Sequence, residues 1–177
     1  MTIDPIQLQR FTSAGITQSA VRLGKAGTGV TGMRSAAREF CSRIKLGELP
    51  KATAYPVSLD KWTKQLARQL PKGGQCWGVA RKCLNIFMRD ARYNVYLCEA
   101  YPRLKCLEHV LEVPLDSYTA KGLLGEAGAV NFGLKGWDAI IRLTPDQNRK
   151  FQDWAQIVAD REGISRVHLD LRYFPFP

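Results

Sequence analysis

The chain has 177 residues, of which 45% are hydrophobic and 24% are charged, and its formal net charge is +10. This length permits one domain with a buried core, and this composition excludes a wholly disordered chain. No apolar run is long enough to cross a bilayer, and residues 1–10 lack the basic and apolar regions of a secretory signal. We therefore expect an intracellular, monomeric protein that has no membrane partner.

The first third of the chain combines a weakly patterned segment with two predicted helices. Residues 1–32 end in a glycine-rich stretch and predict a flexible arm. Residues 35–44 carry apolar side chains at helical spacing, which predicts a helix that stops before Pro50. Ser58 is a typical N-cap residue, so a second helix is expected from Ser58 to Leu70.

A long helix is predicted to begin near Gly78. Its apolar positions are spaced three and four residues apart, which is typical of a helix with one buried face; they are Ala80, Cys83, Leu84, Phe87, Met88 and Ala91. A second face of the same helix is polar and carries Lys82, Asn85 and Arg89. We expect this polar face to meet solvent or a ligand.

The second half of the chain is again mainly helical. The helical pattern breaks at Pro102, and Asp116 precedes a short helix that covers residues 117–124. Thr144 and Pro145 predict the start of another helix, which ends at Gly163. Residues 165–176 alternate between apolar and polar side chains and predict a short extended tail. The sequence thus predicts a single, mainly α domain over residues 1–177.

Cysteine spacing and charge restrict the chemistry. The five cysteines include no C-x-x-C pair, so we expect neither a disulfide framework nor a metal site, and nothing indicates another cofactor. Residues 21–51 include seven Lys or Arg and only two acidic residues, and residues 81–105 include six Lys or Arg and only two acidic residues. A basic domain of this kind favours a polyanionic partner, above all nucleic acid.

Two segments carry the candidate catalytic and phosphate-binding residues. The first is a glycine-containing loop, residues 71–77, which runs directly into the helix that holds Lys82. Backbone N–H groups in such a turn, together with the positive end of the helix, can bind a phosphate. The helix end, Arg81 and apolar packing would lower the pKa of Lys82, as a nucleophilic lysine requires. The second segment ends in Asp116, whose carboxylate can cap a helix and stabilise a developing cation.

These segments resemble the helix-hairpin-helix DNA glycosylases. Gly78-Val-Ala-Arg-Lys-Cys-Leu-Asn85 is similar to the family's Gly-Val-Gly-Arg-Lys-Thr-Ala-Asn, and Val113-Pro-Leu-Asp116 is similar to its Val-Pro-Val-Asp. Ala80 stands where the family has a second glycine, the interval from Lys82 to Asp116 is longer than usual, and no iron–sulfur cysteine cluster is present. The resemblance covers about 45 residues.

The resemblance implies a helix-hairpin-helix motif and a catalytic segment within residues 71–124. It implies double-stranded DNA with a modified or damaged base as the partner, and cleavage of the N-glycosidic bond of the flipped-out base. Lys82 would form a Schiff base with the sugar, as in enzymes that also act as lyases at abasic sites, and Asp116 would stabilise the transition state. The residues expected to contact DNA are Gly74, Gln75, Gly78, Ala80, Arg81, Asn85 and Arg89.

Two other functions remain open at this point. A non-catalytic module that keeps the hairpin for phosphate contact would show the same basic composition. An enzyme of base hypermodification on the same scaffold would use the aspartate with a different acceptor. Both alternatives predict that no adduct forms at Lys82.

Overall fold

The computed structural model describes residues 4–20 and 31–174 of the chain. These residues fold into helices, and no strand occurs among them, which confirms the predicted mainly α class. The α-helices are α1 (Pro5–Ala20), α2 (Met33–Ser42), α3 (Tyr55–Gln69), α4 (Trp77–Tyr93), α5 (Val95–Ala100), α6 (Arg103–Cys106), α7 (Ser117–Gly125), α8 (Pro145–Glu162) and α9 (Leu169–Tyr173). The short 3-10 turns are η1 (Leu46–Glu48), η2 (Ala52–Ala54), η3 (Glu108–Val110), η4 (Ile140–Arg142) and η5 (Arg166–His168).

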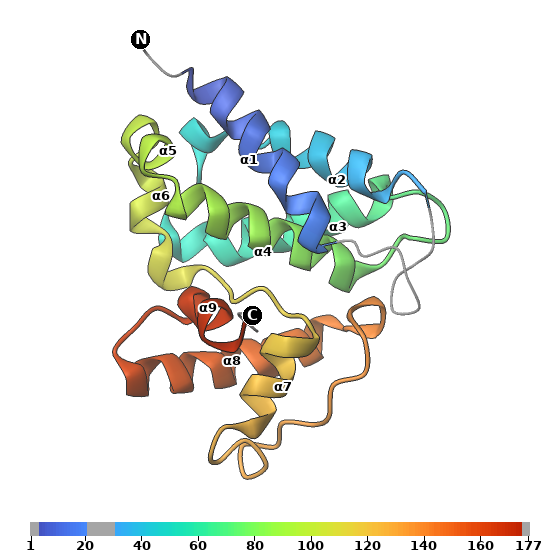
Figure 1. The fold of residues 1–177 in the computed structure, drawn as a ribbon, viewed down its shortest axis with the longest axis vertical. Coiled ribbons are helices and arrows are strands. Elements are labelled where there is room, and N and C mark those ends of the chain that lie inside the picture. The colour runs from blue at the N-terminus through green and yellow to red at the C-terminus, as the bar shows by residue number, and fades with distance from the viewer. Residues whose placement is uncertain (1–3, 21–30, 175–177) are drawn as a thin grey trace.

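The helices enclose two hydrophobic clusters. The N-terminal cluster is built from α1 to α6, and the C-terminal cluster is built mainly from α7, α8 and α9 (Figure 1). Ile140 of η4 packs against both clusters. Helix α4 crosses the middle of the molecule and has neighbours on both sides, so it is the element that joins the two clusters (Figure 1).

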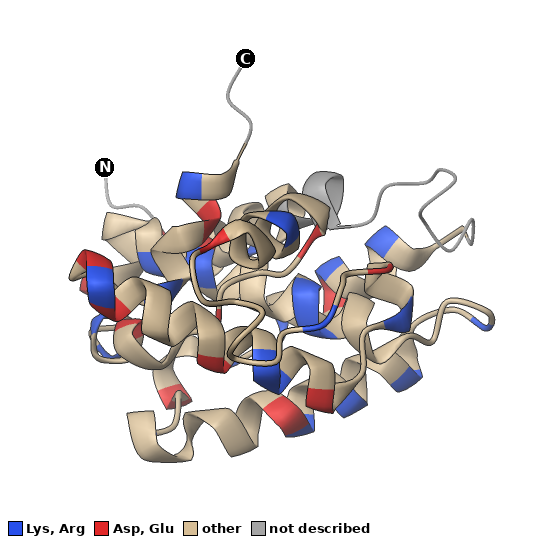
Figure 2. Ribbon diagram, turned by 90° about the horizontal axis from the view of Figure 1, so that it is seen from below, with Lys and Arg blue, Asp and Glu red and all other residues tan. Residues whose placement is uncertain are grey.

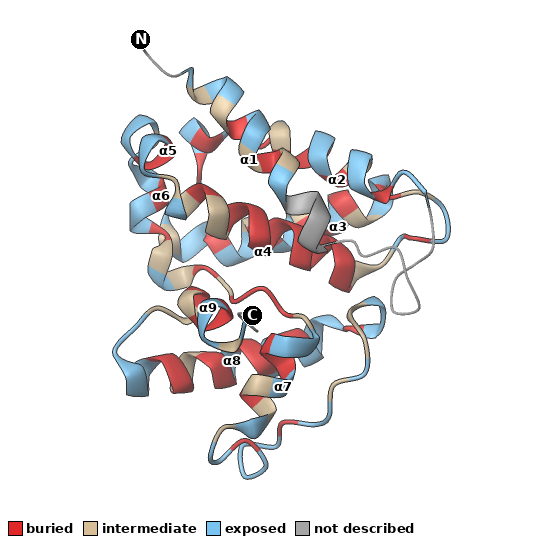
Figure 3. Cartoon of the chain, viewed as in Figure 1, coloured by how far each residue is buried: buried red, intermediate tan, exposed pale blue. Residues whose placement is uncertain are grey.

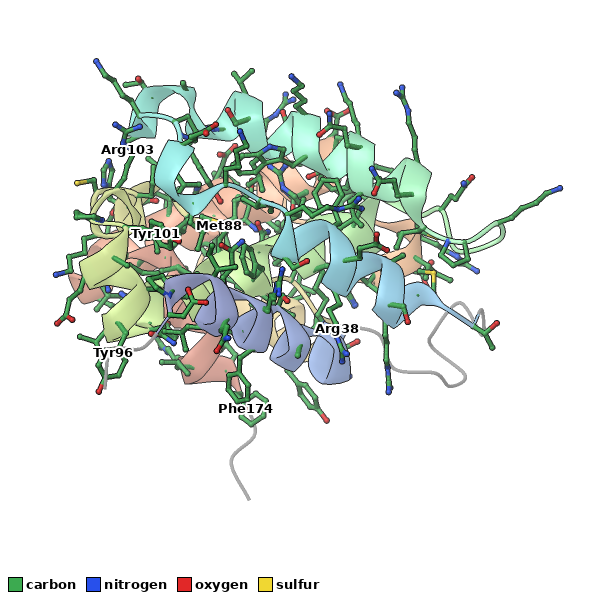
Figure 4. The ribbon with its side chains drawn as sticks, turned by 90° about the horizontal axis from the view of Figure 1, so that it is seen from above. Arg38, Met88, Tyr96, Tyr101, Arg103 and Phe174 are labelled. Atoms are coloured by element: carbon green, nitrogen blue, oxygen red, sulfur yellow. The ribbon has the colours of Figure 1, made fainter. Side chains whose placement is uncertain are left out.

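Helix α4 is buried over most of its length, as Figure 3 shows. Its apolar residues lie in the N-terminal cluster, where Met88 points into the interior (Figure 4). The predicted polar face is not open to solvent, because Lys82 and Asn85 are also buried and face partners from the C-terminal half. Of the two environments expected for this face, open solvent is therefore wrong for Lys82 and Asn85, and contact with a ligand stays a prediction. A polar face on a central helix can be covered when the adjoining segments supply matching charges.

The starts of the later helices agree with the sequence. The Asp116 side chain caps α7 by accepting hydrogen bonds from two backbone N–H groups. Thr144 and Gln147 form a reciprocal capping box at the start of α8, and Gly163 ends α8 in the left-handed conformation that glycine favours. These local signals lie within a few residues of the helix end, which explains why the sequence predicted them correctly.

The N-terminal part of the chain differs from the prediction. The expected flexible arm includes helix α1, and Gln9 of α1 donates hydrogen bonds to the carbonyl oxygens of Cys41 and Ile44. These long-range bonds give a weakly patterned segment a fixed place. Helix α3 begins at Tyr55 with Pro56 in its first turn, so Ser58 lies inside the helix and is not its N-cap. The glycine-rich residues 21–30 lie outside the described part.

The C-terminal tail is also different from the prediction. Residues 166–173 form η5 and α9 and are not extended. Val167 and Leu169 are both fully buried, which gives the alternation that was interpreted as a strand. Asp170, which follows Leu169, is buried as well and accepts a hydrogen bond from Thr119 of α7. Tertiary contacts therefore explain the apolar spacing that the sequence alone assigned to extended backbone.

None of the helices within residues 4–20 and 31–174 is both long and apolar enough to cross a membrane.

Candidate active site between the two helical clusters

Helix α4 follows directly on a short turn after α3. Gly73 has a φ of 86°, and the N–H of Gly74 donates to the carbonyl oxygen of Pro71 at 2.8 Å, which closes the turn. Gly78, in the first turn of α4, lies directly against η4, because a Cβ atom there would approach the Ile140 carbonyl oxygen to 2.1 Å. Only glycine fits this contact, so η4 covers the beginning of α4.

The two residues predicted as a catalytic pair face each other. Lys82 Nζ lies 3.6 Å from Asp116 Oδ2. The other carboxylate oxygen of Asp116, Oδ1, accepts hydrogen bonds from the N–H groups of Tyr118 and Thr119 at 2.9 and 3.0 Å. The Lys82 side chain is 9% exposed and the Asp116 side chain 32%. The carboxylate is thus fixed by helix α7 and is the more accessible member of the pair.

The segment that carries Asp116 is held at its centre by Gln152 of α8. The N–H of Val113 donates to Gln152 Oε1 at 3.0 Å, and Gln152 Nε2 donates to the Val113 carbonyl oxygen at 2.9 Å. Both groups are buried. The Gln152 amide therefore satisfies the two backbone groups of Val113 as a neighbouring strand would, and keeps the segment 112–116 against α8.

Glu112, at the start of this segment, binds Arg81 of α4. Arg81 Nε and Nη2 donate to the two oxygens of Glu112 at 2.8 and 2.6 Å, in a bidentate pair. Arg81 Nη1 donates to Asp60 Oδ1 at 2.7 Å and to Thr63 Oγ1 at 3.1 Å, both on α3. The Arg81 and Glu112 side chains are only 5% and 11% exposed. This ion pair therefore joins α3, α4 and the segment 112–116.

Two asparagines complete the environment of Glu112. Asn85 of α4 and Asn148 of α8 each donate an amide hydrogen to Glu112 Oε2, at 3.0 and 3.2 Å. Burial raises the pKa of the Glu112 carboxyl, but the hydrogen bonds and charge of Arg81 outweigh burial and bring the pKa below its ordinary value of 4.5. Glu112 is therefore ionised at neutral pH in spite of its burial.

Arg89 binds two aspartates. It forms an ion pair with Asp170 of α9 and another with the adjacent Asp90. The other oxygen of Asp170 accepts a hydrogen bond from Thr119 Oγ1 at 3.1 Å, and Thr119 is the residue whose N–H donates to Asp116. Arg89 thus connects α4, through Asp170, to the first turn of α7.

Most of the residues predicted to contact DNA are buried or bound within the protein. Arg81 and Asn85 are buried and bound to Glu112, and Ala80 is a helical core residue with no exposed surface. Gly74 is buried beneath Met33 and Gly78 beneath η4. Arg89 is half-buried in ion pairs, and Gln75 alone of the seven has an exposed side chain. The expectation that Arg81 and Asn85 form a DNA-facing surface does not fit their burial, and their partners give them a structural role.

Several residues of the site have no counterpart in the sequence prediction. They are Glu112, Asn148, Gln152, Thr119 and Asp170. Glu112 had one available signal, since a carboxylate inside an apolar segment requires a buried cation nearby. The others lie on α7, α8 and α9, and no local pattern relates them to α4.

Within the described part of the chain, no three His, Cys, Asp or Glu side chains gather where they could hold a metal ion. Comparison of the chain with models of protein families, with curated proteins and with solved structures yields no match.

Proposed function

We propose that this protein cleaves the N-glycosidic bond of a modified base in DNA, with Lys82 as the nucleophile and Asp116 as the stabilising carboxylate. The observation that carries the proposal is the approach of Lys82 Nζ to Asp116 Oδ2 at 3.6 Å, across 34 residues of sequence. Two motifs that resemble one family, in the same order, thus meet in space. We also propose that α3, the turn at residues 70–76 and α4 correspond to the helix-hairpin-helix of that family.

The chemistry follows from the two side chains. The neutral amine of Lys82 attacks C1′, and the C1′–N bond breaks as its electron pair passes to the base, which takes up one amine proton. The C1′–O4′ bond of the sugar then breaks as the nitrogen forms a double bond to C1′, and the remaining amine proton passes to the ring oxygen, which gives a Schiff base at Lys82 and a hydroxyl group at C4′. The Asp116 carboxylate, which the first turn of α7 holds in place, stabilises the positive charge that develops on the sugar.

The buried ion pair between Arg81 and Glu112 has a positioning role in this proposal. It fixes the start of the segment whose end carries Asp116, while Gln152 fixes the middle. Such preorganisation keeps the carboxylate near the amine without movement during the reaction. Arg81 therefore contributes to the site through Asp116 and not through contact with DNA.

Borohydride trapping tests the proposal. The protein is incubated with a duplex that carries an abasic site or an oxidised base, reduced, and digested to locate the modified residue. We expect a covalent adduct on Lys82 that disappears in Lys82→Gln and persists in the control Lys150→Gln, an exposed lysine on α8. Asp116→Asn should lower base release at least 100-fold and retain the cap on α7. Circular dichroism checks that each variant is folded.

The outcomes separate the three functions. An equal adduct yield in Lys82→Gln, or no adduct with any duplex, would remove the nucleophile. Unchanged base release in Asp116→Asn would remove the glycosylase itself. Salt-dependent DNA binding without base release would favour the non-catalytic module, and modification of the base without its release would favour the hypermodification enzyme.

A further inference from the structure

Helix α3 carries a line of positive charge along its exposed face. Lys61, Lys64 and Arg68 follow one another at intervals of three and four residues, and Lys72 continues the line in the turn after the helix. All four side chains are exposed. Figure 2 marks the lysines and arginines of the molecule in blue, and several of them lie along its lower edge. We call these four residues the α3 basic stripe.

The described part of the protein does not neutralise the stripe. Among the described residues, none of its four side chains has an ion-pair partner. The one acidic residue of α3, Asp60, is bound to Arg81. Like charges three and four residues apart destabilise a helix by a few tenths of a kcal/mol per pair. Arg68 lies in the last turn, where the helix dipole favours a cation, but Lys61 and Lys64 have no such compensation.

Ion pairs do form at other helices of the molecule. Arg43, which follows the last residue of α2, pairs with Glu39 of α2, and Arg149 pairs with Asp146 on α8. In these two pairs a carboxylate lies close to the guanidinium, whereas no carboxylate of the described residues pairs with a side chain of the stripe. The stripe is therefore an exposed surface whose charge is complementary to a polyanion.

The dimensions suit a nucleic-acid backbone. Lys61 and Arg68 are seven residues apart, which is about 10 Å along a helix. Each strand of double-stranded DNA carries one phosphate per roughly 3.4 Å of the duplex axis, so this length of one strand holds about three phosphates. Lys72 extends the stripe to the turn that includes Gln75, the exposed member of the predicted DNA contacts. The stripe therefore ends in the same turn that holds Gln75.

We infer that the α3 basic stripe binds the phosphate backbone of double-stranded DNA. This inference rests on the proposed function for the identity of the polyanion, while the contact itself requires no chemistry at Lys82. The stripe takes the place of Arg81, which is buried, and Arg89, which is half-buried in ion pairs, as the source of electrostatic affinity. It supplies affinity without reading sequence, because phosphate contacts carry no base information.

The test is the salt dependence of binding to an unmodified duplex, measured by fluorescence anisotropy. The stripe variant carries Lys61→Gln, Lys64→Gln and Arg68→Gln. The matched control carries Lys105→Gln, Lys135→Gln and Lys150→Gln, which removes the same charge from exposed positions on other elements. Glutamine has a helix propensity close to that of lysine and arginine, so α3 should remain folded.

We expect the stripe variant to bind the duplex at least about tenfold more weakly at 100 mM salt, and to lower the slope of log K against log salt by about 2 to 3. The control should bind nearly as the unchanged protein does. Equal affinities and slopes for the two variants would overturn the inference, as would an unchanged protein that does not bind the duplex at low salt. It would also be overturned if the stripe variant lost binding to anionic vesicles and kept its binding to DNA.

The proposed function and the stripe can fail separately. If Lys82 gives no adduct but the stripe variant loses duplex binding, the stripe stands and the glycosylase does not. If both variants bind the duplex equally and the adduct forms on Lys82, the glycosylase stands and the stripe does not. At saturating concentrations of abasic duplex, the stripe variant should still form the Lys82 adduct.

Discussion

Replacement of Glu112 by glutamine tests how far the buried ion pair supports the site. Glu112 accepts two hydrogen bonds from Arg81 and one each from Asn85 and Asn148. Glutamine keeps the shape but has only one acceptor oxygen, so its amide group must face one of these donors. The negative charge opposite Arg81 is lost as well.

The magnitude follows from the burial of the pair. Removal of one partner from a buried ion pair costs about 3 to 5 kcal/mol. Asp60 still partly neutralises Arg81, so we expect the lower end, about 3 kcal/mol in the free energy of unfolding. For a chain of this size that corresponds to a fall in Tm of roughly 6 to 12 °C. Thermal unfolding followed by circular dichroism measures it.

The pH dependence gives a second measurement of the same group. Because the pKa of Glu112 is lowered in the folded protein, its stabilisation is complete above its unfolded pKa, near 4.5, and is lost as the pH falls through the folded pKa. Glu112→Gln removes this contribution, so its stability should fall less steeply than that of the unchanged protein as the pH is lowered from 4.5.

An exposed ion pair supplies the control. Glu48 pairs with Lys45 at 3.0 Å, with both side chains more than two-thirds exposed, so Glu48→Gln should change the free energy of unfolding by less than about 0.5 kcal/mol. If Glu112→Gln were destabilised by less than 1 kcal/mol, or if its acid dependence matched that of the unchanged protein, the role assigned to Glu112 would be refuted.

Three further predictions concern single positions. Gly78→Ala should lower the free energy of unfolding by about 1 to 3 kcal/mol, because its Cβ would collide with η4; the control Gly125→Ala, which has open space around it, should be neutral or slightly stabilising in urea titrations. Asp116→Ala should cost about 1 kcal/mol through the lost cap of α7, whereas Asp116→Asn should cost less, and equal losses in thermal unfolding would contradict the capping role. Cys106 is exposed and should react with a thiol reagent in the folded protein, whereas Cys83, whose pKa burial raises to about 12, should react only on unfolding; rapid modification of Cys83 in mass spectra would disagree with its place in the core.

Local signals account for the parts of the fold that the sequence predicted. Helices α4, α7 and α8 begin within a residue or two of their predicted positions, because the apolar spacing or the capping residues of each lie within the helix itself. Helix α1 has few such signals, and its position depends on Gln9 bonds to carbonyl oxygens more than 30 residues away. The tail misled because Val167 and Leu169 are buried by different neighbours and not by one sheet face.

In the candidate site, too, local motifs predicted some residues correctly, whereas the environment of others depends on distant parts of the chain. Lys82 and Asp116 were predicted as a pair from two motifs, and the structure places them together. Of the residues expected to contact DNA, Arg81 and Asn85 are buried and Arg89 is half-buried in ion pairs, because all three bind long-range partners that residue type does not reveal. Glu112 and Asp170 supply those partners, and neither lies near α4 in the sequence. A charged residue on a central helix therefore cannot be assigned to the surface until its partners are known.

The adjacent residues Arg81 and Lys82 have complementary roles that follow from helix geometry. Successive side chains of an α-helix point about 100° apart, and an extended span of four residues covers roughly 13 Å. Two long side chains that diverge from neighbouring positions can therefore bind both ends of the segment 112–116, Arg81 at Glu112 and Lys82 at Asp116. One end is a buried, fully hydrogen-bonded pair, and the other is partly exposed and looser, with 3.6 Å between its atoms. The buried pair between Arg81 and Glu112 restricts the motion of the segment at the end where no chemistry is needed. It thereby also limits how far the accessible end, where the proposed reaction takes place, can move.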